Sequence, residues 1–155
     1  MIRKFAFLIS VAVIMVSVPA FSQEESKGRK LTIIWQRLVD QKNQTCSRCS
    51  ETGVEVEQAA RKIQQAFQHL GVVVKYRAEK ISLEEFNKAP LASNRITINE
   101  KSVEEWIGGS SGKSRCNSSC GTNDCRTVKC DGQEFEAVPG RLIIKACLLA
   151  LANLF

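Results

Sequence analysis

The sequence predicts a small α/β domain with one sheet and a closing C-terminal helix. Three observations lead to this prediction. Runs rich in β-branched residues alternate along the chain with stretches whose apolar residues recur at helical spacing. Motifs typical of helix N-termini separate several of these segments. A two-residue turn typical of a β-hairpin lies near the end, and no internal repeat is found.

Residues 1–22 are expected not to belong to this domain. Two basic residues precede an apolar run that ends at Val18, and small residues follow it. This pattern is typical of a secretory signal peptide, whereas a membrane anchor needs roughly 20 apolar residues with different flanks. We therefore expect an exported protein, periplasmic or secreted, that starts near Gln23. Residues 23–30 are expected to be flexible, and no stable membrane anchor is expected after cleavage.

The first part of the domain is predicted to run from strand to loop, helix and second strand. Residues 31–39 (LTIIWQRLV) are apolar and β-branched at their start, which favours a strand. Thr52 has Glu55 three residues later, a capping box that predicts a helix beginning at Gly53. The apolar stripe of that helix leads to the second strand, residues 71–76 (GVVVKY).

The second part repeats these signals before its composition changes. Ser82 and Ser102 each have a glutamate three residues later, so each predicts a short helix. Residues 95–99 (RITIN) alternate like a strand. Residues 108–125 are rich in Gly, Ser and Cys without apolar periodicity, which predicts a loop. An Asp-Gly hairpin turn follows, and an apolar helix from Pro139 closes the domain.

The distribution of charge argues against one class of partner. The net charge falls from +6 to +4 when Arg3 and Lys4 are removed with the leader. The remaining basic residues are scattered along the chain, whereas a nucleic-acid interface needs a basic cluster or stripe. We therefore expect no nucleic-acid partner.

A CxxC motif, TCSRCSETG, carries the strongest candidate chemistry. In a thiol–disulfide oxidoreductase, Cys46 would attack a disulfide as a thiolate, and Cys49 would resolve the resulting mixed disulfide. Arg48 supplies a cation that favours a thiolate, although a helix beginning at Gly53 would give Cys46 little of the helix dipole. The expected partners are protein thiols or disulfides, or a redox partner protein. No cofactor is expected.

A metal site is the alternative use of the same motif. Four thiolates could bind zinc or another soft ion, and such sites also capture mercury or arsenic(III). The four candidate ligands are Cys46, Cys49, Cys120 and Cys125.

A third interpretation makes the cysteines of the loop region structural. Disulfides would stabilise a Gly/Ser-rich loop on a binding module, because cross-links restrict the unfolded chain. The same cysteines could instead form a second dithiol that relays electrons to the CxxC motif. The candidates for either role are Cys116, Cys120, Cys125 and Cys130. Cys147, within LIIKACLLAL, is expected to be a buried, inert thiol.

Four stretches point to a known family: WQRLVDQKNQTCSRCSETG, PLASNRITINEKSVEEWIG, CGTNDCRT and the closing P-x-x-L-I-I-K-A. Over residues 31–150, they resemble an uncharacterised thioredoxin-like family, domain of unknown function 2703. The resemblance implies a single thioredoxin-like domain with a Cys-rich loop inserted before the final hairpin and helix. It implies no established activity. Redox thioredoxins place a cis-proline immediately before the third strand, facing the dithiol, where this chain has Ser93 and Asn94.

Overall fold

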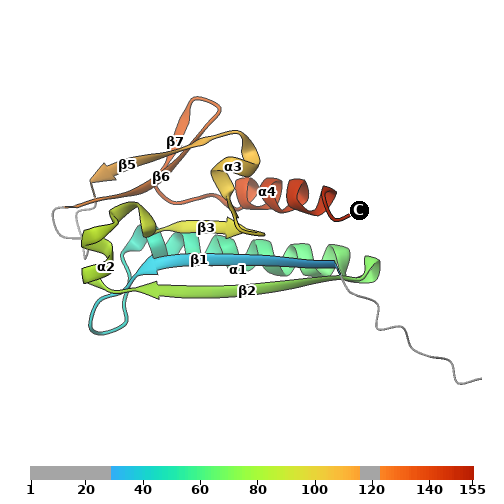
Figure 1. Ribbon diagram of the computed structural model, residues 1–155, viewed down its shortest axis with the longest axis horizontal. Coiled ribbons are helices and arrows are strands. Elements are labelled where there is room, and N and C mark those ends of the chain that lie inside the picture. The colour runs from blue at the N-terminus through green and yellow to red at the C-terminus, as the bar shows by residue number, and fades with distance from the viewer. Residues whose placement is uncertain (1–28, 116–122) are drawn as a thin grey trace, which may run out of the picture.

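The computed structural model describes residues 29–115 and 123–155, which form two sheets and four α-helices (Figure 1). The predicted leader, Cys116 and Cys120 lie outside these residues. The α/β prediction is confirmed. In chain order, the elements are β1 (Arg29–Leu38), α1 (Ser47–Phe67), the 3-10 helix η1 (Gln68–Leu70), β2 (Val72–Ile81), α2 (Leu83–Lys88), the 3-10 helix η2 (Pro90–Ala92), β3 (Arg95–Ile98), β4 (Lys101–Ser102), α3 (Val103–Ile107), β5 (Ser110–Arg115), β6 (Asp124–Cys130), β7 (Gln133–Phe135) and α4 (Gly140–Ala152).

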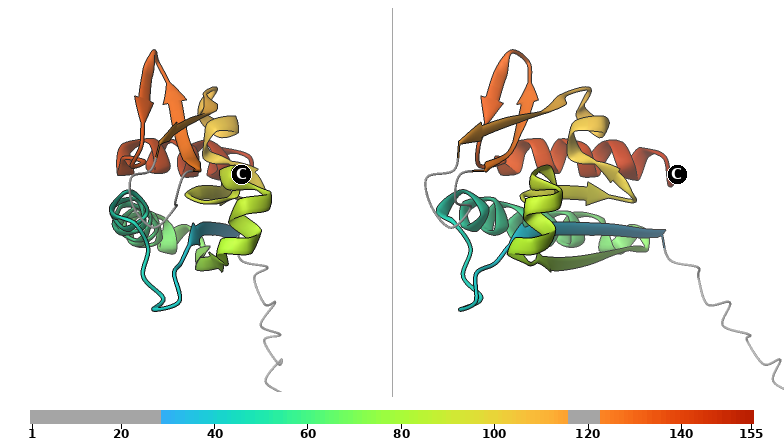
Figure 2. Two further views of the ribbon diagram at one scale, coloured as in Figure 1. Left: turned by 90° about the vertical axis from the view of Figure 1, so that its left-hand side faces the viewer. Right: turned by 60° about the vertical axis from the view of Figure 1, so that its left-hand side comes forward.

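The main sheet has the strand order β2-β1-β3-β4, with α1 and α4 packed on the same side of it (Figure 2). Strand β1 is parallel to β2 and antiparallel to β3. Because side chains alternate along a strand, every second residue of β1 faces the helices, and Leu31, Ile33 and Trp35 are buried there. Gly53 lets the Trp35 ring lie against the backbone of α1, since a Cβ at Gly53 would overlap the ring.

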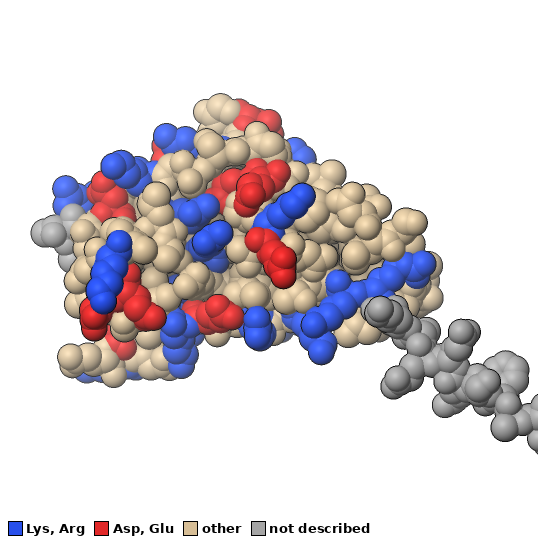
Figure 3. Space-filling view, viewed as in Figure 1, with Lys and Arg blue, Asp and Glu red and all other residues tan. Residues whose placement is uncertain are grey.

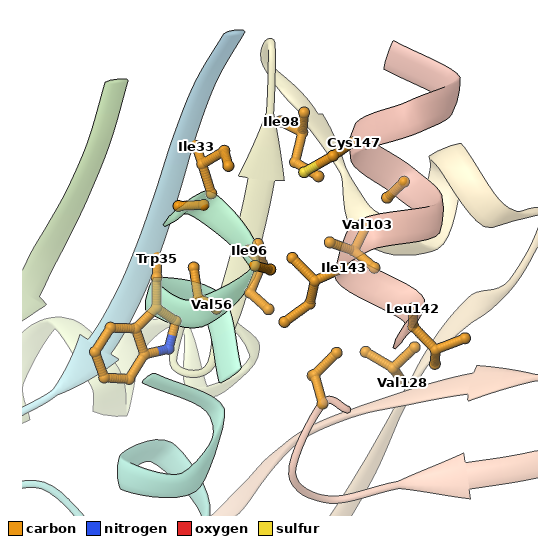
Figure 4. Packing of buried hydrophobic residues seen from close by; sticks show 14 of the residues in the cluster. Ile33, Trp35, Val56, Ile96, Ile98, Val103, Val128, Leu142, Ile143 and Cys147 are labelled. Atoms are coloured by element: carbon orange, nitrogen blue, oxygen red, sulfur yellow. The ribbon is translucent and has the colours of Figure 1, made fainter. Parts of the chain in front are cut away.

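The core extends from the main sheet to α4 and to the second sheet. Figure 4 shows Ile33 and Ile98 of the sheet facing Ile143 and Cys147 of α4. Val128 of β6 belongs to the same buried cluster. The described residues therefore share one hydrophobic core, which holds both sheets together.

The prediction of a single sheet is wrong, because the strands form a second sheet. Its strand order is β5-β6-β7, and each neighbouring pair is antiparallel. Ser110–Arg115 of the predicted loop forms β5, because the backbone of β6 pairs with it although its side chains are small and polar. The predicted hairpin turn is confirmed at Asp131 and Gly132, which have the positive φ angles of 52° and 74° that such turns require.

Several predicted helix ends are confirmed in detail. Ser82 and Ser102 both form complete capping boxes, in which the hydroxyl accepts the backbone N–H of the glutamate and the glutamate carboxylate accepts that of the serine. Strand β1 begins at Arg29, inside the segment predicted to be flexible. The Arg29 guanidinium donates to the carbonyls of Leu70 and Leu154 at 3.1 and 3.2 Å, which ties the start of the strand to the end of η1 and to the residues after α4.

The surface carries mixed charge over the face seen in Figure 3, where Lys and Arg side chains are interspersed with Asp and Glu. Exposed pairs such as Lys88 with Glu84 and Arg77 with Glu79 contribute to this mixture. Within the described part of the chain, no helix combines the length and the apolar character needed to cross a bilayer.

Candidate functional site

The CxxC motif lies at the N-terminus of α1, a helix of 21 residues. Cys46 is the N-cap residue, and its carbonyl accepts the N–H of Ser50 at 2.9 Å. Cys49 lies in the first turn. The prediction that this helix begins at Gly53 is therefore wrong, and the motif stands at the positive end of the helix dipole.

The two residues of the pattern that predicted the later start, Thr52 and Glu55, form hydrogen bonds elsewhere. Thr52 is buried inside α1, and its hydroxyl accepts the N–H of Val138 at 3.1 Å. The Glu55 carboxylate accepts the N–H of Gly140 at 2.9 Å, at the first residue of α4. Both side chains therefore bind the chain that leads into α4, and this long-range pairing is not visible in the local pattern.

Both motif sulfurs are withdrawn from solvent. Cys46 is 5% exposed and Cys49 is 1% exposed. The side chain of Cys46 hydrogen-bonds the Cys49 thiol, and this bond, burial and the charge of Cys46 hold the pKa of Cys49 well above its usual range. The hydroxyls of Ser93 and Thr45 act against that shift. Cys49 therefore keeps its proton at neutral pH.

Ser93 is the site residue that the sequence analysis did not assign. Its Oγ lies 3.7 Å from the sulfur of Cys49 and accepts the N–H of Leu38 at 3.1 Å. It is fully buried and lies two residues before β3. Among the described residues all peptide bonds are trans. No local pattern identifies Ser93, because its contact with Cys49 joins segments that are distant in the sequence.

The neighbouring Asn94 has the left-handed φ of 57°. Its amide nitrogen donates to the Glu136 carbonyl at 3.0 Å, which holds the turn before β3 against the chain between β7 and α4. Asparagine is one of the few residues that tolerate this conformation. The turn that carries Ser93 is thereby fixed beside the dithiol.

Arg48 forms an ion pair and hydrogen bonds with residues outside the motif. Its guanidinium lies 2.8 Å from the Glu136 carboxylate and donates to the Ser114 hydroxyl at 2.8 Å. It also donates to the carbonyl of Arg115, the last residue of β5. Arg48 therefore links the N-terminus of α1 to the second sheet, and its charge is paired there.

A cleft of about 630 Å³ opens between the ends of β1 and β2 and the start of α2. Its lining includes Leu38, Ile81 and the exposed side chain of Leu83. Leu38 connects the cleft to the dithiol, because its carbonyl accepts the Thr45 hydroxyl and its N–H donates to Ser93. Clefts at the C-terminal ends of parallel strands are common binding sites.

The other cysteines lie apart in the chain. Cys125 is buried in β6, while Cys130 and Cys147 are buried free thiols. Burial raises the pKa of Cys147 to about 12, and burial is also the largest cause of the raised pKa of Cys130. The predicted burial of Cys147 is confirmed. Disulfides that involve Cys116 or Cys120 stay a prediction, because these residues are outside the described chain.

The predicted four-thiolate site also stays a prediction. Its set includes Cys120, which the structure does not describe. Within residues 29–115 and 123–155, no group of three or more His, Cys, Asp and Glu side chains is arranged to hold an ion. The described members of that set are Cys46, Cys49 and Cys125.

Comparison with known proteins supports the family resemblance. The family model described as Domain of unknown function (DUF2703) matches residues 31–147, a range that contains all seven cysteines. An "Uncharacterized protein" of Archaeoglobus fulgidus is 37% identical over 115 residues, which make up 74% of this chain and 82% of that relative. No solved structure matches. The family predicted from the sequence motifs is confirmed.

Proposed function

The chain belongs to the family described as Domain of unknown function (DUF2703), and we propose that it is a thiol–disulfide oxidoreductase. One observation carries the proposal: Cys46 and Cys49 form a hydrogen-bonded, buried pair at the N-terminus of α1. A helix N-terminus stabilises a thiolate through its dipole and unpaired N–H groups. A thiolate is the nucleophile in thiol–disulfide exchange.

The two cysteines have different roles in the proposed reaction. The Cys46 thiolate attacks one sulfur of a substrate disulfide, so the substrate S–S bond breaks and one substrate thiol leaves. Cys49 then attacks Cys46 in the mixed disulfide and releases the second substrate thiol. The substrate gains two electrons and two protons, and the enzyme retains a Cys46–Cys49 disulfide. The reverse sequence oxidises a dithiol, and no cofactor is needed because the sulfurs carry the electrons.

The topology supports a thioredoxin-like assignment for this domain. The CxxC motif joins β1 to α1, β2 is parallel to β1, and β3 is antiparallel to it. Helices α1 and α4 pack on each other beside the sheet. This is the order of elements that the thioredoxin resemblance implies. The chain departs from it in the sheet β5-β6-β7, which is inserted before α4, and in having Ser93 and Asn94 before β3 where the redox thioredoxins have a cis-proline.

The surroundings favour a polypeptide substrate in an oxidising compartment. The apolar cleft beside Leu38 would hold a side chain of an extended segment next to its disulfide. The leader predicted at residues 1–22 would export the protein to the periplasm or the exterior, where disulfides persist. Protein thiols and disulfides are therefore the proposed partners.

The test is whether the motif cycles between dithiol and disulfide. The purified protein is equilibrated in glutathione buffers of different potential, quenched with acid and alkylated, and the masses of the peptides containing Cys46 and Cys49 are measured. We expect one reversible two-electron transition. Cys49→Ser should trap a mixed disulfide at Cys46, and Cys46→Ser should abolish exchange. Cys147→Ala, which changes a buried thiol away from the motif, is the matched control and should cycle normally.

Two results would contradict the proposal. A folded protein whose motif stays reduced at every potential does not catalyse this exchange. A metal ion that co-purifies with the protein, and that is lost from Cys46→Ser, would favour the four-thiolate interpretation instead. Native mass spectrometry of the same samples distinguishes these two cases.

A further inference from the structure

We propose that Ser93 is a further catalytic residue of the dithiol, whose hydroxyl donates a hydrogen bond to the sulfur of Cys49 during the resolving step. This inference rests on the proposed function of the CxxC pair. It concerns the second half of the reaction, in which Cys49 must carry negative charge in a buried environment.

The hydrogen bonds around Ser93 leave one role for its proton. A serine hydroxyl has a single proton and two acceptor lone pairs. The N–H of Leu38 donates to this oxygen at 3.1 Å, so the oxygen acts as an acceptor on that side. Among the described residues, the other hydrogen-bond contact of this hydroxyl is the sulfur of Cys49 at 3.7 Å, where either atom could donate. The hydroxyl proton is therefore available to Cys49.

The proton of Cys49 is engaged elsewhere in the reduced pair. The Cys49 thiol is hydrogen-bonded to the side chain of Cys46, so its sulfur is free to accept from Ser93. Consistent with donation from the hydroxyl, Ser93 lowers the pKa of Cys49 against the larger effects of Cys46 and burial. Ser93 is itself fully buried, which excludes water from competing for this contact.

The contact matters most when Cys49 becomes a nucleophile. In the mixed disulfide, Cys46 is bonded to a substrate sulfur and its own charge is gone. Cys49 loses its proton, attacks Cys46 and breaks the bond between Cys46 and the substrate. The departing substrate thiolate takes up a proton, so two cysteine thiols and one disulfide yield one Cys46–Cys49 disulfide and two substrate thiols. A hydrogen bond to a charged sulfur is stronger than one to a neutral sulfur, so Ser93 stabilises the attacking thiolate.

A matched control for the loss of a buried hydroxyl exists in α1. The Thr52 hydroxyl also accepts a buried backbone N–H at 3.1 Å, that of Val138, and Thr52 is as buried as Ser93. Within the described chain, no hydrogen bond joins the Thr52 hydroxyl to a sulfur. Thr52→Val therefore reproduces the structural cost of Ser93→Ala without touching the dithiol.

The experiment follows one turnover with glutathione disulfide as the probe. Wild type, Ser93→Ala, Ser93→Thr and Thr52→Val are reduced, mixed with the probe, quenched with acid at successive times and measured by mass spectrometry. Each trace yields the rate at which the mixed disulfide forms at Cys46 and the rate at which it resolves. The pH dependence of the resolving rate is recorded for each variant.

In Ser93→Ala, we expect the mixed disulfide at Cys46 to resolve at least about tenfold more slowly than in the wild type, so that it accumulates. This factor corresponds to the loss of a hydrogen bond to a charged group. The alkaline rise of the resolving rate in this variant should shift to higher pH. Formation of the mixed disulfide should be unchanged, and Ser93→Thr and Thr52→Val should resolve like the wild type.

Other outcomes overturn the inference. If Ser93→Ala resolves at the rate of Thr52→Val, the role of Ser93 is structural. If Ser93→Ala does not fold, Ser93→Thr decides the question, and a folded threonine variant that accumulates the mixed disulfide contradicts the role of the hydroxyl. A wild type that never forms the mixed disulfide refutes the proposed function itself, whereas normal wild-type exchange with unaltered Ser93→Ala refutes only this inference.

Discussion

The surroundings of each buried thiol set its protonation. Cys49 and Cys147 are both inaccessible, and both have raised pKa values, yet their surroundings differ. Cys49 has a second thiol and two hydroxyls around it, whereas burial is the one cause of the shift of Cys147. The surroundings of Cys49 are suited to thiol chemistry, whereas Cys147 acts as a small apolar side chain.

The raised pKa of Cys147 predicts a loss of stability at alkaline pH. The pKa of this thiol is 9.0 ordinarily and about 12 in the folded protein. Between those values the unfolded chain is ionised and the folded chain is not, so the folded state binds more protons and the free energy of unfolding falls as pH rises. Cys147→Ala removes this contribution. Urea unfolding at neutral pH and at about pH 10 should show a smaller alkaline loss for the variant than for the wild type.

The other ionisable groups are present in both proteins and cancel in the comparison. An equal alkaline loss in the two proteins would show that Cys147 ionises in the folded state as readily as in the unfolded chain.

Helix α1 has a second role as the anchor of α4. Glu55 accepts the N–H of Gly140, and Thr52 accepts that of Val138, so one face of α1 holds the entry to α4. A Cβ at Gly140 would overlap the Glu55 carboxylate, so a larger residue at this position would displace the carboxylate. A carboxylate at a helix N-terminus is favourable both as a hydrogen-bond acceptor and as a charge.

Removal of this cap should destabilise the protein measurably. We expect Glu55→Ala to lower the free energy of unfolding by about 1 kcal/mol, the usual cost of a lost N-terminal cap. Glu55→Gln keeps an acceptor oxygen and should cost less. Glu57→Ala, which removes an exposed carboxylate of the same helix, is the control. Urea denaturation measures all three, and a Glu55→Ala effect no larger than that of Glu57→Ala would remove Glu55 from this role.

A buried ion pair links the second sheet to α3, in addition to the shared core. Arg126 of β6 lies 2.8 Å from Glu104 of α3, and their side chains are only 12% and 4% exposed. Arg126 also donates to the Leu91 carbonyl in η2, which leads to Ser93. The pair therefore connects the second sheet to the segment that carries the dithiol contact.

Loss of one member of this pair should leave a buried charge without its partner. We expect Arg126→Ala to lower the free energy of unfolding by about 3 kcal/mol or more. Arg61→Ala, which breaks an exposed pair with Glu57, should cost less than about 1 kcal/mol. Because the core spans both sheets, tryptophan fluorescence and circular dichroism should report the same transition in Arg126→Ala. Two separate transitions would show that the sheets are independent units.

Local patterns in the chain predicted much of this architecture. The capping boxes at Ser82 and Ser102, the Asp131-Gly132 turn and the closing helix were all predicted correctly, as was the strand at residues 95–99. Each depends on hydrogen bonds or side-chain alternation within a few neighbouring residues, so the sequence contains the necessary information. The CxxC motif was also recognisable from the sequence, because its spacing alone brings two sulfurs together.

Long-range contacts determine the features that local patterns predicted wrongly or did not predict. The Thr52-Glu55 pattern predicted a helix start, but its side chains bind Val138 and Gly140, and the helix begins at Ser47 instead. The polar segment 110–115 becomes a strand because β6 supplies its backbone partners. Ser93 meets Cys49 across more than forty residues of chain. Composition and spacing do not encode such partners, since these hydrogen bonds form only when distant segments are packed into one core.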